Sequence, residues 1–124
     1  MAIEGSTQQE KLLREVVSAM QAKKARRVTL LDLRGIDKAV CDYFVVCHAD
    51  SAPHIRSIAE EVEDRVGSAL GEWPLRMSGK ENALWIVMDY FTVVVHVFST
   101  AMREFYDLDS LWSDAKRTEF PDED

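Results

Sequence analysis

Apolar residues recur at helical spacing in two long segments of the chain. Thr7 followed by Glu10 forms a capping box, a common start of a helix. Ser51 is a suitable N-cap for a second helix, with Pro53 in its first turn. The apolar face of the first helix is Leu12, Leu13, Val16, Val17 and Met20, and that of the second is Ile55, Ile58, Ala59, Val62 and Val66. The spacing therefore predicts two amphipathic helices, each with one face turned to a core.

Five shorter apolar runs predict β-strands. The runs are residues 28–33, 43–47, 75–77, 84–89 and 92–98. The second run is almost continuously apolar, which is typical of a strand covered on both faces, and the third run is weak. The last two runs are close enough to form a hairpin, and Ser99 or Thr100 then opens a short helix with a further turn behind it.

This order of elements predicts one α/β domain over residues 1–124. We expect a mixed five-stranded sheet flanked by helices, in the order helix, two strands, helix, three strands, helix. Residues 8–115 are expected to be ordered, and residues 116–124 to form a flexible acidic tail.

Side chains alternate across a strand, so each face of the hairpin follows from the sequence. With a turn centred on Tyr90 and Phe91, Trp85 lies opposite His96. The aliphatic face is Ile86, Met88, Val93, Val95 and Val97, and the mixed face is Trp85, Val87, Asp89, Thr92, Val94 and His96. Either the mixed face receives a partner around Trp85, or Trp85 packs beneath a helix and His96 is a hydrogen-bonded core residue. Phe91 is an unusual residue for a tight turn.

Composition narrows the classes of partner. The 124 residues carry 15 basic and 22 acidic side chains, a formal net charge of −7. Proteins that bind nucleic acid do so largely through Lys and Arg, so little direct nucleic-acid binding is expected. Binding to an anionic membrane is not expected either. The two cysteines suggest no disulfide framework, and neither a signal peptide nor a membrane-spanning run is visible. A cytoplasmic protein is expected.

The search for catalytic chemistry finds no convincing active site. The sequence has no glycine-rich phosphate loop and no familiar metal-ligand spacing. Cys47 and His48 are neighbours in a predicted strand, so they point to opposite faces and cannot act as a nucleophile and base. Four aspartates could hold Mg²⁺ but are more simply explained as strand-end or loop residues: Asp32, Asp37, Asp42 and Asp89. No catalytic residue, metal or cofactor is predicted.

Six segments, in order and spacing, resemble the ribosomal silencing factor family, also called RsfS or Iojap. They are Leu31-Asp32-Leu33-Arg34-Gly35, residues 41–47, residues 58–63, residues 85–90, residues 93–98, and residues 103–108 with Leu111-Trp112. The resemblance spans about residues 8–115. It implies a nucleotidyltransferase-like fold that lacks nucleotidyltransferase activity.

The resemblance also implies a function and a site. Family members bind the large ribosomal subunit through ribosomal protein uL14 at the subunit-joining face. They thereby block the small subunit and repress translation, with a further part in large-subunit maturation. The implied contacts are Trp85, Asp89 and Tyr90. Ser78 and Thr92 stand where the family usually has acidic residues, which shifts the expected interface towards apolar contact by Trp85, Tyr90 and Phe91.

Two other interpretations stay open at this point. The first is a Mg²⁺-dependent enzyme of the nucleotidyltransferase type that uses Asp32 or Asp42. The second is a self-associating module, in which the mixed face pairs with a second copy as a homodimer.

Overall fold

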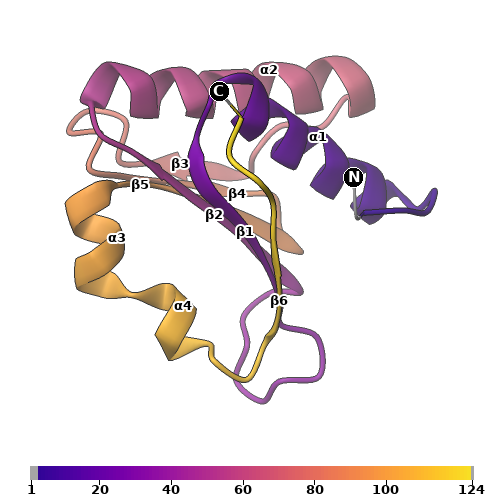
Figure 1. The fold of residues 1–124 in the computed structure, drawn as a ribbon. Coiled ribbons are helices and arrows are strands. Elements are labelled where there is room, and N and C mark those ends of the chain that lie inside the picture. Colours follow the sequence, from indigo (N-terminus) through magenta and orange to yellow (C-terminus); the bar gives the residue numbers. More distant parts are fainter. Residues whose placement is uncertain (1–2, 124) are drawn as a thin grey trace.

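The computed structural model describes residues 3–123 and contains one six-stranded sheet with helices on both faces. In chain order the elements are α1 (Gln8–Ala22), β1 (Arg26–Asp32), β2 (Tyr43–Ala49), α2 (Ala52–Leu70), β3 (Arg76–Ser78), β4 (Trp85–Asp89), β5 (Val93–Ser99), α3 (Thr100–Tyr106), α4 (Leu108–Leu111) and β6 (Lys116–Glu119). Helices α1 and α2 lie over one face, and the short α3 and α4 lie against the other (Figure 1). The predicted α/β class and mixed sheet are confirmed.

The two long helices begin where the sequence predicts. The Thr7 hydroxyl accepts from the backbone N–H of Glu10 at 3.1 Å, and the Glu10 carboxylate accepts from the backbone N–H of Thr7 at 3.0 Å. Ser51 caps α2 by accepting from the backbone N–H of His54. Gly71 ends α2 in the left-handed conformation, with φ 66°. These local bonds satisfy terminal N–H groups that have no partner inside a helix.

The sheet runs in the order β3-β4-β5-β2-β1-β6. Its two central strands, β2 and β5, are parallel, and all other neighbours are antiparallel. Strand β2 is buried along nearly its whole length, as its continuous apolar sequence predicts.

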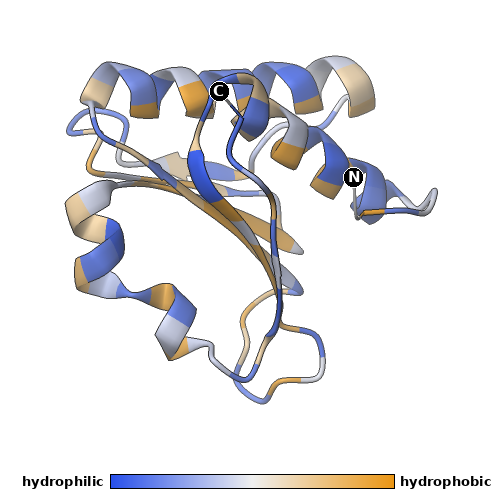
Figure 2. Ribbon diagram, viewed as in Figure 1, coloured by the Kyte–Doolittle hydropathy of each residue, from blue (hydrophilic) through white to orange (hydrophobic). Residues whose placement is uncertain are grey.

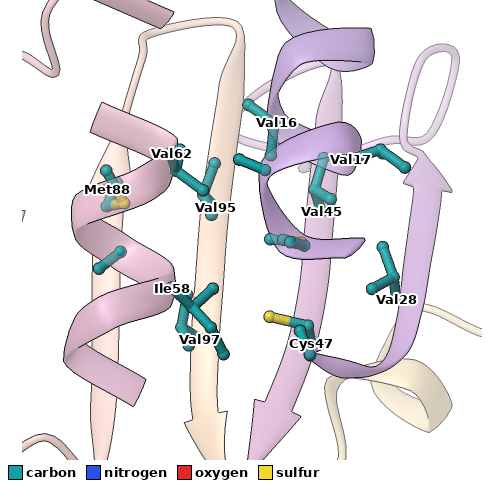
Figure 3. Close-up of a cluster of buried hydrophobic side chains, with 14 of the residues drawn as sticks. Val16, Val17, Val28, Val45, Cys47, Ile58, Val62, Met88, Val95 and Val97 are labelled. Atoms are coloured by element: carbon teal, nitrogen blue, oxygen red, sulfur yellow. The ribbon is translucent and has the colours of Figure 1, made fainter. Parts of the chain in front are cut away.

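The main core lies between the sheet and the two long helices. The apolar stripes of α1 and α2 turn towards the strands, while their outer faces are polar (Figure 2). In Figure 3, side chains of both helices meet those of the strands beneath: Val16, Val17, Val28, Val45, Cys47, Ile58, Val62, Met88, Val95 and Val97. A second cluster, built around Leu31, Phe44, Val46 and Phe98, fills the space under α3 and α4.

The C-terminal segment corrects two expectations. Residues Lys116–Glu119 form strand β6, antiparallel to β1, so the sheet has six strands and this part of the expected tail belongs to the fold. Phe120 follows in the core, and its N–H donates to the carbonyl of Val28 at 2.9 Å. The strand sequence Lys-Arg-Thr-Glu has no apolar alternation, so it carries no local strand signal. Pairing with β1 is what orders it.

The hairpin register was predicted two residues out. Asp89 lies opposite Val94 and Trp85 opposite Phe98. The turn is therefore centred on Phe91 and Thr92 rather than on Tyr90 and Phe91. Because the shift is an even number of residues, each side chain stays on its predicted face.

An aspartate accounts for the turn. Phe91 adopts φ 76°, a left-handed conformation that is rare for a bulky residue, and its N–H donates to Asp89 Oδ1 at 2.8 Å. Asp89 thus stabilises the turn through its side chain.

Candidate functional site

The two faces of the hairpin have the burial that the alternation predicts. On the aliphatic face, the side chains of β4 and β5 are fully buried beneath the long helices. On the mixed face, Trp85, Val87 and Asp89 are only partly buried. Strand β3 extends this face, because Arg76 pairs with Asp89 and Ser78 pairs with Val87. The mixed face is thus only partly covered at the β3–β4 end of the sheet.

The cover on this side of the sheet is incomplete. The α3–α4 segment lies under the central strands, where Phe44, Val46 and Phe98 are buried. Trp85 and Val94 pack at the border of that cluster and keep part of their surface accessible. The interpretation in which Trp85 packs against the chain's own residues is therefore partly right, and the interpretation in which a partner covers it stays a prediction. One side of the indole packs on the chain's own aromatic rings, and the rest meets solvent.

The orientation of the Trp85 indole is set by three neighbours. Its Nε1–H donates to Nδ1 of His96 at 3.1 Å. Its ring stacks on Phe98, with centroids 4.9 Å apart at an angle of 22°. The Tyr106 ring of α3 contacts it at a centroid distance of 4.6 Å. A large aromatic side chain held in one orientation loses little conformational entropy when a partner covers it.

His96 is a core residue that positions Trp85. Only 5% of its surface is exposed, and its ring contacts the Phe44 ring at 4.5 Å. Burial lowers the pKa of His96 to about 4, because the cation would lose its hydration. At neutral pH the ring is uncharged, so Nδ1 can accept a hydrogen bond from the indole N–H, and Nε2 carries the ring hydrogen. That Nε2 is buried without a partner in the described part of the chain.

Helix α3 adds aromatic surface that the sequence analysis did not place at the site. Phe105 is 74% exposed and Tyr106 46% exposed, and their rings contact each other at 5.1 Å. With Trp85 and Phe98 they form one continuous row of rings. The signal was present in the sequence: neighbouring residues of a helix are about 100° apart, so a short helix cannot turn two consecutive rings into the same core.

The other predicted contact residues divide between surface and core. Ser78 is exposed, Asp89 and Thr92 are partly exposed, and Phe91 is 73% exposed at the tip of the turn. Tyr90 is the exception. It is 5% exposed and belongs to the core under the long helices.

The position of Tyr90 corrects the expectation that its ring contacts a partner. Tyr90 is two residues from Met88 and four from Ile86, so the alternation of side chains turns it to the same inward face. Burial raises the pKa of its phenol, and the charges of Glu63 and Glu72 add to this. Tyr90 therefore supports the hairpin from inside the fold.

Three of the four aspartates considered for Mg²⁺ have structural partners, Asp89 through the turn described above. Asp32 forms a two-pronged ion pair with Arg34, with N–O distances of 2.9 and 2.8 Å. Asp42 accepts from the side-chain amide of Gln9 at 3.0 Å. Within residues 3–123 no cluster of three or more His, Cys, Asp or Glu side chains is arranged to hold a metal ion. In the same residues no helix is long and apolar enough to cross a bilayer.

Comparisons with known proteins agree on one family. The family model described as "Ribosomal silencing factor during starvation" matches residues 6–124. A ribosomal silencing factor of Halalkalibacterium halodurans is 37% identical over 110 residues, covering 89% of this chain and 92% of that one. The chloroplastic protein Iojap of Arabidopsis thaliana is 30% identical over 82 residues, covering 66% of this chain and 34% of the plant protein.

Solved structures support the same assignment. A crystal structure from Bacillus halodurans matches with a TM-score of 0.74 and 35% identity, covering 90% of this chain and 99% of that one. Sequence and fold agree over nearly the whole chain, and the resemblance seen in the motifs is confirmed. The chain belongs to the ribosomal silencing factor family, whose model is described as acting during starvation.

Proposed function

We propose that this protein represses translation by binding the large ribosomal subunit through ribosomal protein uL14 and covering the subunit-joining face. A small subunit then cannot dock, and no catalytic step is required. Family membership supports a ribosomal role. The observation that carries the proposal is the Trp85 indole, held by His96 and Phe98 yet partly open to solvent at a partly covered end of the sheet.

The proposed docking surface runs along β4 from α3 to the hairpin turn. It consists of Ser78, Trp85, Val87, Asp89, Phe91, Thr92, Phe105 and Tyr106. Its aromatic rings provide an apolar centre, and Ser78, Asp89 and Thr92 provide a polar rim, which is the usual anatomy of a protein interface. The net charge of −7 favours encounter with a basic ribosomal protein through long-range steering.

Co-sedimentation with isolated large subunits tests the docking surface. A buried interfacial Trp typically contributes at least about 2 kcal/mol, so Trp85→Ala should weaken binding about thirtyfold. Trp73→Ala is the matched control, because Trp73 is also exposed but packs over Gly67 of α2, away from the mixed face. Circular dichroism and thermal melting would be used to check that both variants are folded. Unchanged binding by folded Trp85→Ala would refute the role of Trp85.

Subunit joining is the second measurement. Adding small subunits to large subunits pre-incubated with the protein should yield fewer complete ribosomes on a sucrose gradient, and Trp85→Ala should restore them. If the protein co-sediments with large subunits without reducing joining, the exclusion mechanism is wrong. Sedimentation of the protein alone would show whether it forms a homodimer. A dimer abolished by Trp85→Ala would mean that the docking surface also mediates self-association.

A further inference from the structure

A polar cavity lies behind α3, apart from the proposed docking surface. Its volume is about 360 Å³, within the range of small-molecule sites. It is lined by Arg27, His48, Thr100, Arg103, Glu104, Asp107 and Asp109. These residues come from β1, β2, α3, α4 and the corner between the two helices, so segments distant in the sequence meet here.

Arg103 forms the inner wall of this cavity. Its side chain is 4% exposed, and Nη1 donates to the carbonyl of Arg27 at 2.8 Å and to Nδ1 of His48 at 3.1 Å. A guanidinium can only donate, so Nδ1 of His48 must accept, and the ring hydrogen of neutral His48 lies on Nε2. Nε2 forms no hydrogen bond within residues 3–123. His48 therefore offers one unused donor.

Arg27 offers further unused donors. Its guanidinium is 53% exposed and approaches Asp109 and Glu119 only at 3.8 Å, beyond hydrogen-bond length. Its backbone has φ 48°, in the left-handed region, where the β1–β2 register is interrupted by a bulge. Bulges redirect side chains and occur often at functional sites. The strained backbone thus places a loosely held cation beside His48.

At the inner end of the cavity the lining carries two arginines, Arg27 and Arg103, and one carboxylate, Asp109; Glu119 of β6 also lies 3.8 Å from Arg27. Asp109 accepts from Arg103 at 3.2 Å and Arg117 at 2.9 Å, so its charge is already shared between arginines. The pKa of His48 is lowered first by burial and then by Arg103 and Arg27, while Asp50 and Asp122 oppose this. The charges of Arg103 and Arg27, which disfavour protonation of the ring, would attract an anion bound beside it.

The outer part of the cavity has the opposite character. Glu104 is exposed on α3, and Asp107 uses Oδ1 to cap α4 through the N–H of Ser110. Two carboxylates at the rim repel a bare anion but accept hydrogen bonds from hydroxyl groups. A ligand that fits both parts carries an anionic group at one end and hydroxyls at the other.

We propose that this cavity binds a phosphate monoester that carries hydroxyl groups, of the nucleoside monophosphate class. Arg27 and Nε2–H of His48 hold the phosphate, and Glu104 and Asp107 accept from the sugar hydroxyls. Arg103 positions His48 and keeps Asp109 occupied. This site is independent of the ribosomal role proposed above.

Proton NMR of the histidine rings tests the site. The chain has three histidines, so the spectrum is simple, and His54 at the start of α2 is an internal control. Adding AMP should shift the His48 resonances saturably and raise the His48 pKa, with no change at His54. Inorganic phosphate should bind about tenfold more weakly, because it lacks the sugar hydroxyls that donate charge-assisted hydrogen bonds to Glu104 and Asp107.

Variants and a matched ligand separate the two halves of the site. Arg27→Gln should abolish the AMP response. Lys11→Gln removes the same charge at an exposed position of α1 and should leave the response unchanged. Absence of any His48 response to 10 mM AMP in the folded protein would overturn the proposal. Equal affinity for AMP and its 2′,3′-dideoxy analogue would overturn the role of Glu104 and Asp107.

Discussion

Arg103 provides the sharpest test of what holds α3 against the sheet. Its buried guanidinium bonds to the carbonyl of Arg27, to Thr29 Oγ1 at 3.0 Å and to Asp109 at 3.2 Å. Arg103→Met keeps most of the side-chain volume and removes all of these bonds. The carbonyl of Arg27 keeps the Thr29 hydroxyl as a donor, but Asp109 loses its most buried partner.

The expected loss of stability follows from that geometry. Breaking a buried ion pair by removing one partner costs about 3–5 kcal/mol, because the remaining charge is left without compensation. Asp109 keeps Arg117 at 2.9 Å, so the cost should lie near the lower end, about 3 kcal/mol. For a chain of 124 residues this corresponds to a decrease in Tm of roughly 10 °C.

Urea unfolding followed by tryptophan fluorescence measures this loss. The double variant Arg103→Met, Asp109→Leu removes both charges and should be more stable than the sum of the single variants predicts, by about 2 kcal/mol. If Arg103→Met costs less than about 1 kcal/mol, or if the two substitutions are additive, the pair does not hold α3 in place.

Three further predictions concern pH, backbone conformation and the C-terminus. Burial holds the pKa of His96 near 4 against an ordinary 6.5, so the unfolded chain binds the proton more readily. The resulting stability is complete above pH 6.5 and is lost as the pH falls towards 4. The urea midpoint should therefore fall between pH 7 and 4.5, by an equivalent of about 2 kcal/mol, and His96→Gln should reduce this slope. Gly79→Ala should lower the Tm far more than Gly71→Ala. Both glycines have positive φ, but only at Gly79 would the new methyl group collide with the backbone of β4; equal decreases in Tm would contradict this. Ending the chain after Ala115 removes β6 and the buried Phe120, and should cost at least the roughly 3 kcal/mol of losing a core phenylalanine; an unchanged Tm would show that β6 contributes nothing.

The sequence by itself determined the elements whose signals are local. The capping box at Thr7 and the N-cap at Ser51 place the starts of the long helices, because these bonds involve residues three apart. The alternation in the hairpin places Trp85 and Asp89 on one face whatever the register, since residues four apart in one strand point to the same side. The family motifs indicate the function for the same reason: they are patterns along the chain.

Tertiary structure decided what depends on residues far apart in the chain. Strand β6 has a charged sequence and exists because β1 offers an unpaired edge, with Phe120 buried beyond it. Partial cover of Trp85 by Tyr106, and the meeting of Arg103 with His48, bring together elements that no spacing rule connects. Local hydrogen bonds and side-chain parity are properties of a short segment, whereas exposure and charge pairing are properties of the packed whole.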